Sequence, residues 1–357
     1  MEKTRPQTRK QGRGFGWIST NGRTPLELKQ VAPFDSEESD GPPAPAIIER
    51  LEGEIARMPL VASTLPSAIR YFLDGSQRTY DVYFPGYFPM VFSVCAAAIL
   101  ERDPVGSVSL VPGTLELRHT WFVPEHAPRQ PPLVDRIKRE GMSIVDPLER
   151  YQDDDATYAI GLSDYNHIVE TSFAAAKKAR EQLETDILTN WAQRLERASD
   201  AGWIVVDGAL RVCPPRAVGL VKSFTKQHLT GSEATALYDL PAGCRTSAFR
   251  ATDRYRSDLD LDGLGNDVKL RTLWYMRLHD ATGKDGRHGL IRIETSPNVT
   301  APAEIDTLSS WLMNEKHPRA SADARWANLL YPVHMLERML KQYVDRELGA
   351  RIAKVVR

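Results

Sequence analysis

The stretch GWIVVDGAL, residues 202–210, decides the fold prediction. It has the length and the β-branched content of a buried strand, and the strand ends directly at Asp207. RAVGLVKSF, residues 216–224, follows as a second buried strand. Upstream, SAIRYFLDGSQRTYDVYF, residues 67–84, is interpreted as a strand ending at Asp74, a sharp turn at the glycine that follows, and a returning strand.

The segments around these strands alternate in type. Two further strands are predicted within 107–123, and a strand pair at 270–280 and 289–295. Helical spacing of apolar residues predicts helices at 46–60, 303–315 and 331–348, and a mostly helical insert at about 131–197. This alternation predicts an α/β fold, a mixed sheet flanked by helices, in one domain over residues 46–357. Residues 1–45 are basic, then acidic and Pro-rich, which predicts a flexible tail.

Composition narrows the class of protein. The chain has 357 residues, of which 42% are apolar and 26% charged, as in globular domains. The net charge of -1 excludes coating of nucleic acid by bulk charge, but it allows a local basic groove. Three cysteines without a CxxC pair argue against a disulfide framework or a Cys-rich zinc site, and they fit a reducing cytoplasm. The longest apolar run, 88–100, is shorter than the about 20 residues of a membrane span, so we expect a cytoplasmic protein without a membrane segment.

Asp74 and Asp207 occupy similar settings, since each follows an apolar strand and precedes a glycine. This pattern places a carboxylate at the edge of the sheet, where ligands of α/β sheets bind, and the glycine permits a close approach. Two carboxylates from different strands can share a hard cation such as Mg²⁺ or Mn²⁺. The alternative is that each Asp-Gly pair is an ordinary turn.

A metal site of this kind usually needs a third acid. The helix before the second aspartate offers Glu181, Glu184 and Asp186, and Glu170 and Glu149 lie earlier. Most acidic residues on helices are simply solvated, and position within the helix alone does not choose among these five.

Three basic residues are candidates for contacts with an anion. Lys222 ends an apolar strand, where an ammonium group is costly to bury unless it pairs with the carboxylates or a phosphate; a Lys that reaches solvent is the alternative. Strand alternation places Arg277 beside Tyr275, and Arg292 beside Glu294. Both arginines are candidate phosphate contacts, and a cross-strand ion pair with Glu294 is the other possibility.

One acidic segment imitates a calcium loop. DLDLDGLGNDVK, residues 258–269, has Asp at positions 1, 3 and 5 and Gly at position 6. Position 12, however, is Lys269, where a calcium loop requires a bidentate Glu. The segment is therefore interpreted as a solvated acidic loop.

The pieces in order are YFLDGS, a helical insert, GWIVVDGAL, VGLVKSF, LWYMRL, GLIRIE and YPVHMLERML. Over about residues 65–345 this order resembles the NurA family of DNA-end nucleases. The resemblance implies an RNase H-like fold and a nuclease site that uses Mn²⁺ or Mg²⁺. It also implies a homodimer that works with a HerA-type hexameric ATPase in DNA-end resection or in phage defence.

The resemblance also assigns residues. It implies that Asp74 and Asp207 bind the metal, and that the helical glutamate is Glu184, in an R-x-x-x-E context that begins at Arg180, with Glu170 and Glu149 as alternatives. Lys222 matches the lysine of the family's GxxK segment, and Tyr331 matches the tyrosine of its C-terminal YP motif.

The chain departs from the family pattern at one point. The family often has His or Asp eight residues after that tyrosine, and this chain has Met339 there, with His334 and Glu337 nearby.

The expected function is a metal-dependent nuclease that cuts DNA from its ends. Asp74, Glu184 and Asp207 hold the metal, and Lys222 offsets charge on the scissile phosphate. The expected DNA contacts are Arg277, Arg292 and Tyr331, with Tyr275 or Tyr331 stacking on unpaired bases. Two alternatives are a non-catalytic RNase H-like DNA-binding adaptor of an ATPase ring, and a nuclease of another RNase H-like family such as a transposase or resolvase.

Overall fold

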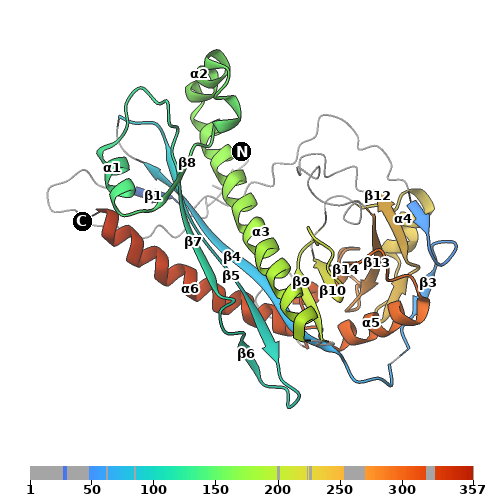
Figure 1. The fold of residues 1–357 in the computed structure, drawn as a ribbon. Coiled ribbons are helices and arrows are strands. Elements are labelled where there is room, and N and C mark those ends of the chain that lie inside the picture. Colours follow the sequence, from blue (N-terminus) through green and yellow to red (C-terminus); the bar gives the residue numbers. More distant parts are fainter. Residues whose placement is uncertain are drawn as a thin grey trace, which may run out of the picture.

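The computed structural model describes residues 27–29, 48–61, 63–83, 86–198, 202–222, 224, 227–252, 270–318 and 326–356. These residues form one sheet of fourteen strands with parallel and antiparallel pairs, and six α-helices flank it (Figure 1). The predicted mixed α/β sheet flanked by helices is therefore confirmed. The predicted loop at 258–269 lies outside the described residues, as does the predicted tail apart from the strand at 27–29.

The elements have the following bounds. The strands are β1 Glu27–Lys29, β2 Ile48–Arg50, β3 Arg57–Pro59, β4 Ile69–Tyr83, β5 Met90–Arg102, β6 Val108–Leu110, β7 Glu116–Phe122, β8 Ser143–Val145, β9 Trp203–Asp207, β10 Ala217–Val221, β11 Cys244–Thr246, β12 Phe249–Thr252, β13 Leu270–Arg277 and β14 Leu290–Thr295. The helices are α1 Pro132–Arg139, α2 Asp155–Ser163, α3 Tyr165–Ala198, α4 Gly231–Tyr238, α5 Pro302–Asn314 and α6 Tyr331–Val356, with short 3₁₀ turns at Glu149–Tyr151 and Trp326–Asn328.

The order of the strands positions the site. The main path is β2-β12-β13-β14-β10-β9-β4-β5-β7-β8. Strands β4, β5 and β7 form an antiparallel meander, whereas β9 runs parallel to both β4 and β10. In the β4–β9 ladder Phe72 pairs with Val205 and Leu73 pairs with Val206, so the next residues on the two strands are Asp74 and Asp207.

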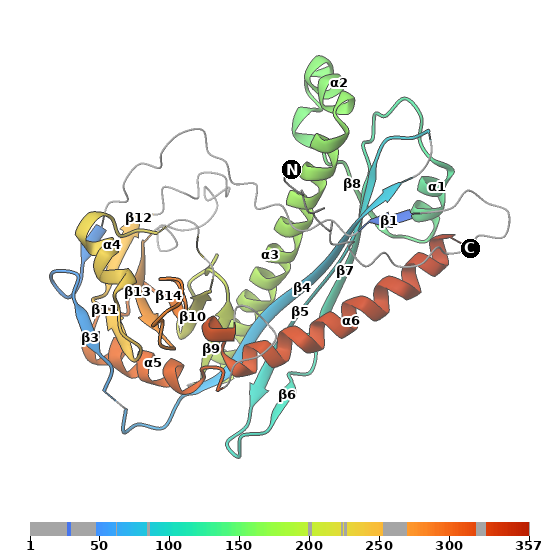
Figure 2. The same ribbon diagram turned by 180° about the vertical axis from the view of Figure 1, so that it is seen from behind.

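The two longest helices cover opposite faces of the meander. Helix α3 lies in front of β4 and β5 in Figure 1, and α6 lies in front of them in the reverse view of Figure 2. On the α3 face, Leu73 packs with Leu183 and Ile187 of the helix. On the α6 face, Phe72 packs with Leu336 of that helix. Because successive side chains of a strand point to opposite faces, each residue of β4 is assigned to one helix or the other.

The helix predicted at 46–60 is wrong. The segment forms the short strands β2 and β3, which pair with β12 and β11. Gly53, between them, has a φ of 80°, a left-handed conformation that an α-helix does not contain. Edge pairing with the sheet therefore overrides the helical spacing of the apolar residues.

The sharp turn predicted after Asp74 is also wrong. Strand β4 continues without interruption to Tyr83, and its pairing with β5 runs from Tyr71 to Val82. Glycine normally weakens a strand because it has no side chain to pack. Here β4 keeps its pairing with β5 through the glycine, and the Glu184 side chain from α3 occupies the space beside it.

The segment 131–197 is mostly helical, as predicted, and it comprises α1, α2 and most of α3. It also contains the short strand β8, which extends the sheet by pairing parallel to β7. Among the described residues, no helix combines the length and the apolar character that a membrane span requires.

Candidate active site

Asp74 and Asp207 meet on the α6 face of the sheet. Their neighbours two residues earlier, Phe72 and Val205, belong to the same apolar cluster on that face, and alternation places the two carboxylates on the same side. Lys222 follows the end of β10, the next strand, and its Nζ lies 2.6 Å from Oδ2 of Asp207. Three adjacent parallel strands thus bring together three of the predicted site residues.

Glu184 reaches the same place from the other face. It belongs to α3, and a Cβ atom built on Gly75 would overlap its carboxylate. Because Gly75 has no side chain, the Glu184 carboxylate can approach the strand beside Asp74. The alternatives Glu170 and Glu149 are exposed, and Glu170 lies about 21 Å along the helix from Glu184.

Asp74 is the most deeply buried of these acids, with 4% of its surface exposed. Its Oδ1 accepts a hydrogen bond from the backbone N–H of Gly75 at 2.8 Å, whereas its Oδ2 is buried and has no hydrogen-bond partner among the described residues. Burial raises the pKa of Asp74 well above its usual range, and the charges of Asp207 and Glu184 raise it further while Lys222 opposes them. The site therefore holds more acid than its surroundings neutralise.

The other two ionised groups respond to the same surroundings. Burial raises the pKa of Glu184 to about 7, although the Arg180 guanidinium beside it acts to lower it. Burial acts to lower the pKa of Lys222, but the carboxylates of Asp207 and Asp74 outweigh it, so this pKa is raised. Lys222 is consequently a cation within a largely buried group of acids.

A fourth acid near this site is Glu337 of α6. Its charge contributes to the raised pKa values of both Asp74 and Lys222. Its Oε1 accepts a bond from Nζ of Lys341 at 2.7 Å. The sequence carries a signal for it, since Glu337 falls between Val333 and the later apolar positions of the helix face that packs on the sheet.

Arg277, a predicted contact with nucleic acid, is buried within the fold. Only 1% of its surface is exposed, and its guanidinium donates hydrogen bonds to backbone carbonyls alone. The acceptors are the carbonyl oxygens of Tyr238, Leu240, Gly286 and His288. The neighbouring Tyr275 is also buried, and its hydroxyl accepts a bond from the His228 N–H, so it offers no face for a base.

Arg292 forms an ion pair with Glu294, the alternative that strand alternation left open. Its Nη2 lies 2.8 Å from Oε1 of Glu294, on the same strand, and the cross-strand partner of that glutamate is Arg271 at 2.9 Å. The Arg292 guanidinium also lies over the ring of Phe224.

Tyr331 is the first residue of α6. It is 48% exposed, and its ring contacts that of His317. It lines a pocket of about 410 Å³ together with Arg102, Lys316 and Met335, among others. The pocket contains none of the acids of the candidate site.

The donor set fits a hard divalent cation. Asp74, Asp207 and Glu184 supply carboxylate oxygens, the ligands that Mg²⁺ and Mn²⁺ prefer, and the buried Oδ2 of Asp74 has no hydrogen-bond partner. Within the described residues, no three His, Cys, Asp or Glu side chains are arranged to hold a metal directly. Two of the three acids are engaged in ion pairs instead, Asp207 with Lys222 and Glu184 with Arg180.

No protein-family model matches the chain, and no curated protein matches it significantly.

Proposed function

We propose that this protein is a divalent-metal-dependent deoxyribonuclease that processes DNA ends, as the resemblance to the NurA family implies. The observation that carries the proposal is the convergence of Asp74, Asp207 and Glu184 from two strands and a helix, next to the Lys222 ammonium. A buried excess of carboxylates is costly for a fold, and a cation-dependent reaction on a phosphate is a reason to maintain it.

We propose further that the sheet is RNase H-like. Such a sheet has a three-stranded antiparallel meander whose first strand is followed, on its other edge, by two parallel strands. Here the meander is β4-β5-β7 and the parallel strands are β9 and β10, with α3 entering between the two parts of the chain. The four strands beyond β10 on the main path extend this arrangement.

The residues would divide the work as follows. Asp74, Asp207 and Glu184 would hold Mn²⁺ or Mg²⁺, and these ions when bound polarise a phosphodiester and neutralise its charge. Lys222 would offset negative charge that develops on the scissile phosphate. Without metal, burial raises the pKa of Glu184 to about 7, so metal binding, which needs the ionised carboxylate, would release a proton near neutral pH.

The proposed partners follow from the sequence resemblance. They are DNA, a second copy of the chain and a HerA-type hexameric ATPase, in DNA repair or phage defence in the cytoplasm. Size-exclusion chromatography with light scattering, alone and with the ATPase, tests the assembly separately from the chemistry.

The test of the activity is digestion of linear DNA with Mn²⁺, with Mg²⁺ and with EDTA. We expect metal-dependent release of nucleotides from linear DNA and little attack on covalently closed circles. Binding of DNA without any cleavage, under all metals and with the ATPase present, would overturn the nuclease and leave the DNA-binding adaptor. That alternative is consistent with the ion pairs that engage Asp207 and Glu184.

A further inference from the structure

Two cations are built into the carboxylate site. Lys222 contacts Asp207 at 2.6 Å, and only 7% of its side chain is exposed. Arg180 contacts Glu184 one turn away on α3, and its Nε also donates to Oε1 of Gln77 in β4 at 3.2 Å. The two pairs reach the site from different elements, one from β10 and one from α3.

These cations balance part of the acidic charge. A buried carboxylate without a counter-charge or a hydrogen bond costs several kcal/mol. Three such acids on adjacent elements would repel one another and separate unless something offset their charge. Lys222 and Arg180 each engage one of them, so the acids can stay together in a protein that holds no metal.

A divalent ion would need the same acids. Asp207 and Glu184 are the two that already have a cation, and Asp74 is the one with a buried oxygen that accepts no hydrogen bond. We propose that Lys222 and Arg180 are counter-ions that hold the site together before metal binds and then compete with the metal for its ligands. This inference rests on the proposed metal site.

The competition has a chemical consequence. A Lys222 ammonium that loses Asp207 keeps its positive charge and needs another anion, because an unpaired buried cation is costly. The substrate phosphate is the anion that arrives with the metal. The same lysine would thus stabilise the metal-free site and, after metal binding, the bound substrate.

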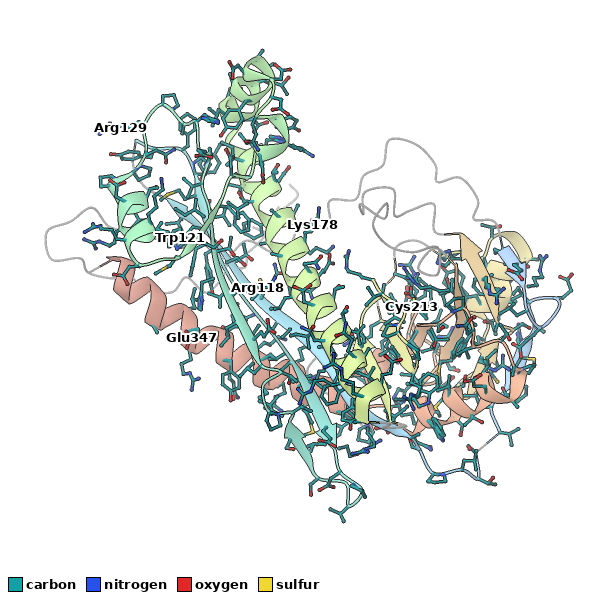
Figure 3. All side chains as sticks on the ribbon, in the orientation of Figure 1. Arg118, Trp121, Arg129, Lys178, Cys213 and Glu347 are labelled. Carbon is teal, nitrogen blue, oxygen red and sulfur yellow. The ribbon has the colours of Figure 1, made fainter. Side chains whose placement is uncertain are left out.

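The test is the affinity for Mn²⁺, measured by calorimetry or by electron paramagnetic resonance without DNA. The variants are Lys222→Met and Arg180→Gln. The matched control is Arg118→Gln, because Arg118 of β7, labelled in Figure 3, pairs at 2.8 Å with Asp186, two residues beyond Glu184 on α3. We expect Mn²⁺ to bind each of the two site variants at least about tenfold more tightly than wild type, from the removal of one nearby positive charge.

Thermal melting gives the second readout. Both site variants should melt at lower temperature than wild type in EDTA, and Mn²⁺ should raise their melting temperature by more than it raises that of wild type. A Lys222→Met protein that folds only with Mn²⁺ would also support the inference. If Lys222→Met folds neither with nor without Mn²⁺, the Mn²⁺ affinity and the melting temperature of Arg180→Gln test the inference.

The failures are distinguishable. Equal or weaker Mn²⁺ binding by the site variants, with normal binding by wild type, would overturn the competition and leave the metal site intact. An absence of Mn²⁺ binding by wild type and by every variant would overturn the metal site and the inference together.

Discussion

Two buried clusters of charged side chains in this protein differ in how completely their groups are paired. In one, Arg245 is fully buried and both of its Nη atoms contact Glu52, at 2.6 and 2.8 Å, while its Nε donates to Asp306 at 2.7 Å. In the other, the acids around Asp74 are only partly offset, and one carboxylate oxygen of Asp74 has no hydrogen-bond partner.

The difference separates a structural cluster from the proposed metal site. Arg245 joins β11 to the segment after β2 and to α5, and its donors are all directed at acceptors within the fold. The guanidinium of this cluster uses its donors for Glu52, Asp306 and a backbone carbonyl, so it has none to offer a ligand. A cluster with an unpaired buried oxygen is an exception that calls for an explanation, and a ligand is one.

The largest expected effect is on the reaction at the acids around Asp74. Asp74→Asn or Asp207→Asn should lower Mn²⁺-dependent cleavage of linear DNA by roughly a thousandfold or more. Stability should stay the same or rise for Asp74→Asn, which removes a poorly compensated buried charge, and it should fall for Asp207→Asn, which takes the paired carboxylate from buried Lys222. Asp81→Asn is the matched control, since Asp81 is buried on the same strand seven residues further along and accepts a bond from Tyr165. Robust cleavage by Asp74→Asn would contradict the assignment.

Breaking the Arg245 cluster should lower stability and leave activity unchanged. Glu52→Ala removes a partner of buried Arg245 and should lower the free energy of unfolding by about 3 kcal/mol. Cleavage per folded molecule should not change. Urea denaturation followed by an activity assay at low temperature measures both quantities. An activity loss without a stability loss would show that the two clusters are not separate.

Glu184 should make stability fall as pH rises, whereas Glu52 in the Arg245 cluster, whose pKa is lowered, should make stability fall as pH decreases. Its pKa is raised from 4.5 to about 7 by burial, so the folded state keeps a proton that the unfolded state loses. In the metal-free protein, the contribution of Glu184 to the free energy of unfolding should therefore be largest below pH 4.5. It should fall by up to about 3 kcal/mol as the pH rises towards 7. Denaturation at a series of pH values in EDTA should show this fall in wild type and a flatter profile in Glu184→Gln. The same slope in both proteins would contradict it, and the exposed Glu170→Gln is the control.

The smallest expected effects come from two glycines. Gly75→Ala should displace the end of the Glu184 side chain and lower cleavage about tenfold, with little change in stability, because the obstructing atoms belong to a flexible side chain. Gly219→Ala should instead lower stability by about 1–3 kcal/mol, since its Cβ would lie 2.9 Å from the Gly208 carbonyl oxygen. Melting temperatures and cleavage rates of both variants separate the outcomes. Equal stability losses would show that Gly75 serves only the strand.

Much of this arrangement could be predicted from local patterns. The apolar strands that end at Asp207 and Lys222, the strand pair β13–β14 and the last two helices are visible because their spacing matches their structure. The placement of Asp74 followed from its similarity to Asp207, although the turn predicted after it does not occur.

The features that local patterns missed depend on distant partners. The side chain that fills the space beside Gly75 is that of Glu184, more than 100 residues later in the chain. Residues 46–60 form strands because β11 and β12 offer them edges. The role of Arg277 depends on four carbonyl groups that only the folded chain brings to it.

Strand β4 has a mechanical consequence. It runs without a break from Ile69 to Tyr83, a length of about 50 Å, and its far end pairs with β1 (Figure 1). A ladder of this kind transmits tension along its backbone instead of absorbing it at a hinge. A molecule that grips the distal end of β4 would therefore pull on the same strand that carries Asp74. A pulling force applied at the distal end of β4 would therefore change the distance between Asp74 and the other carboxylates of the site.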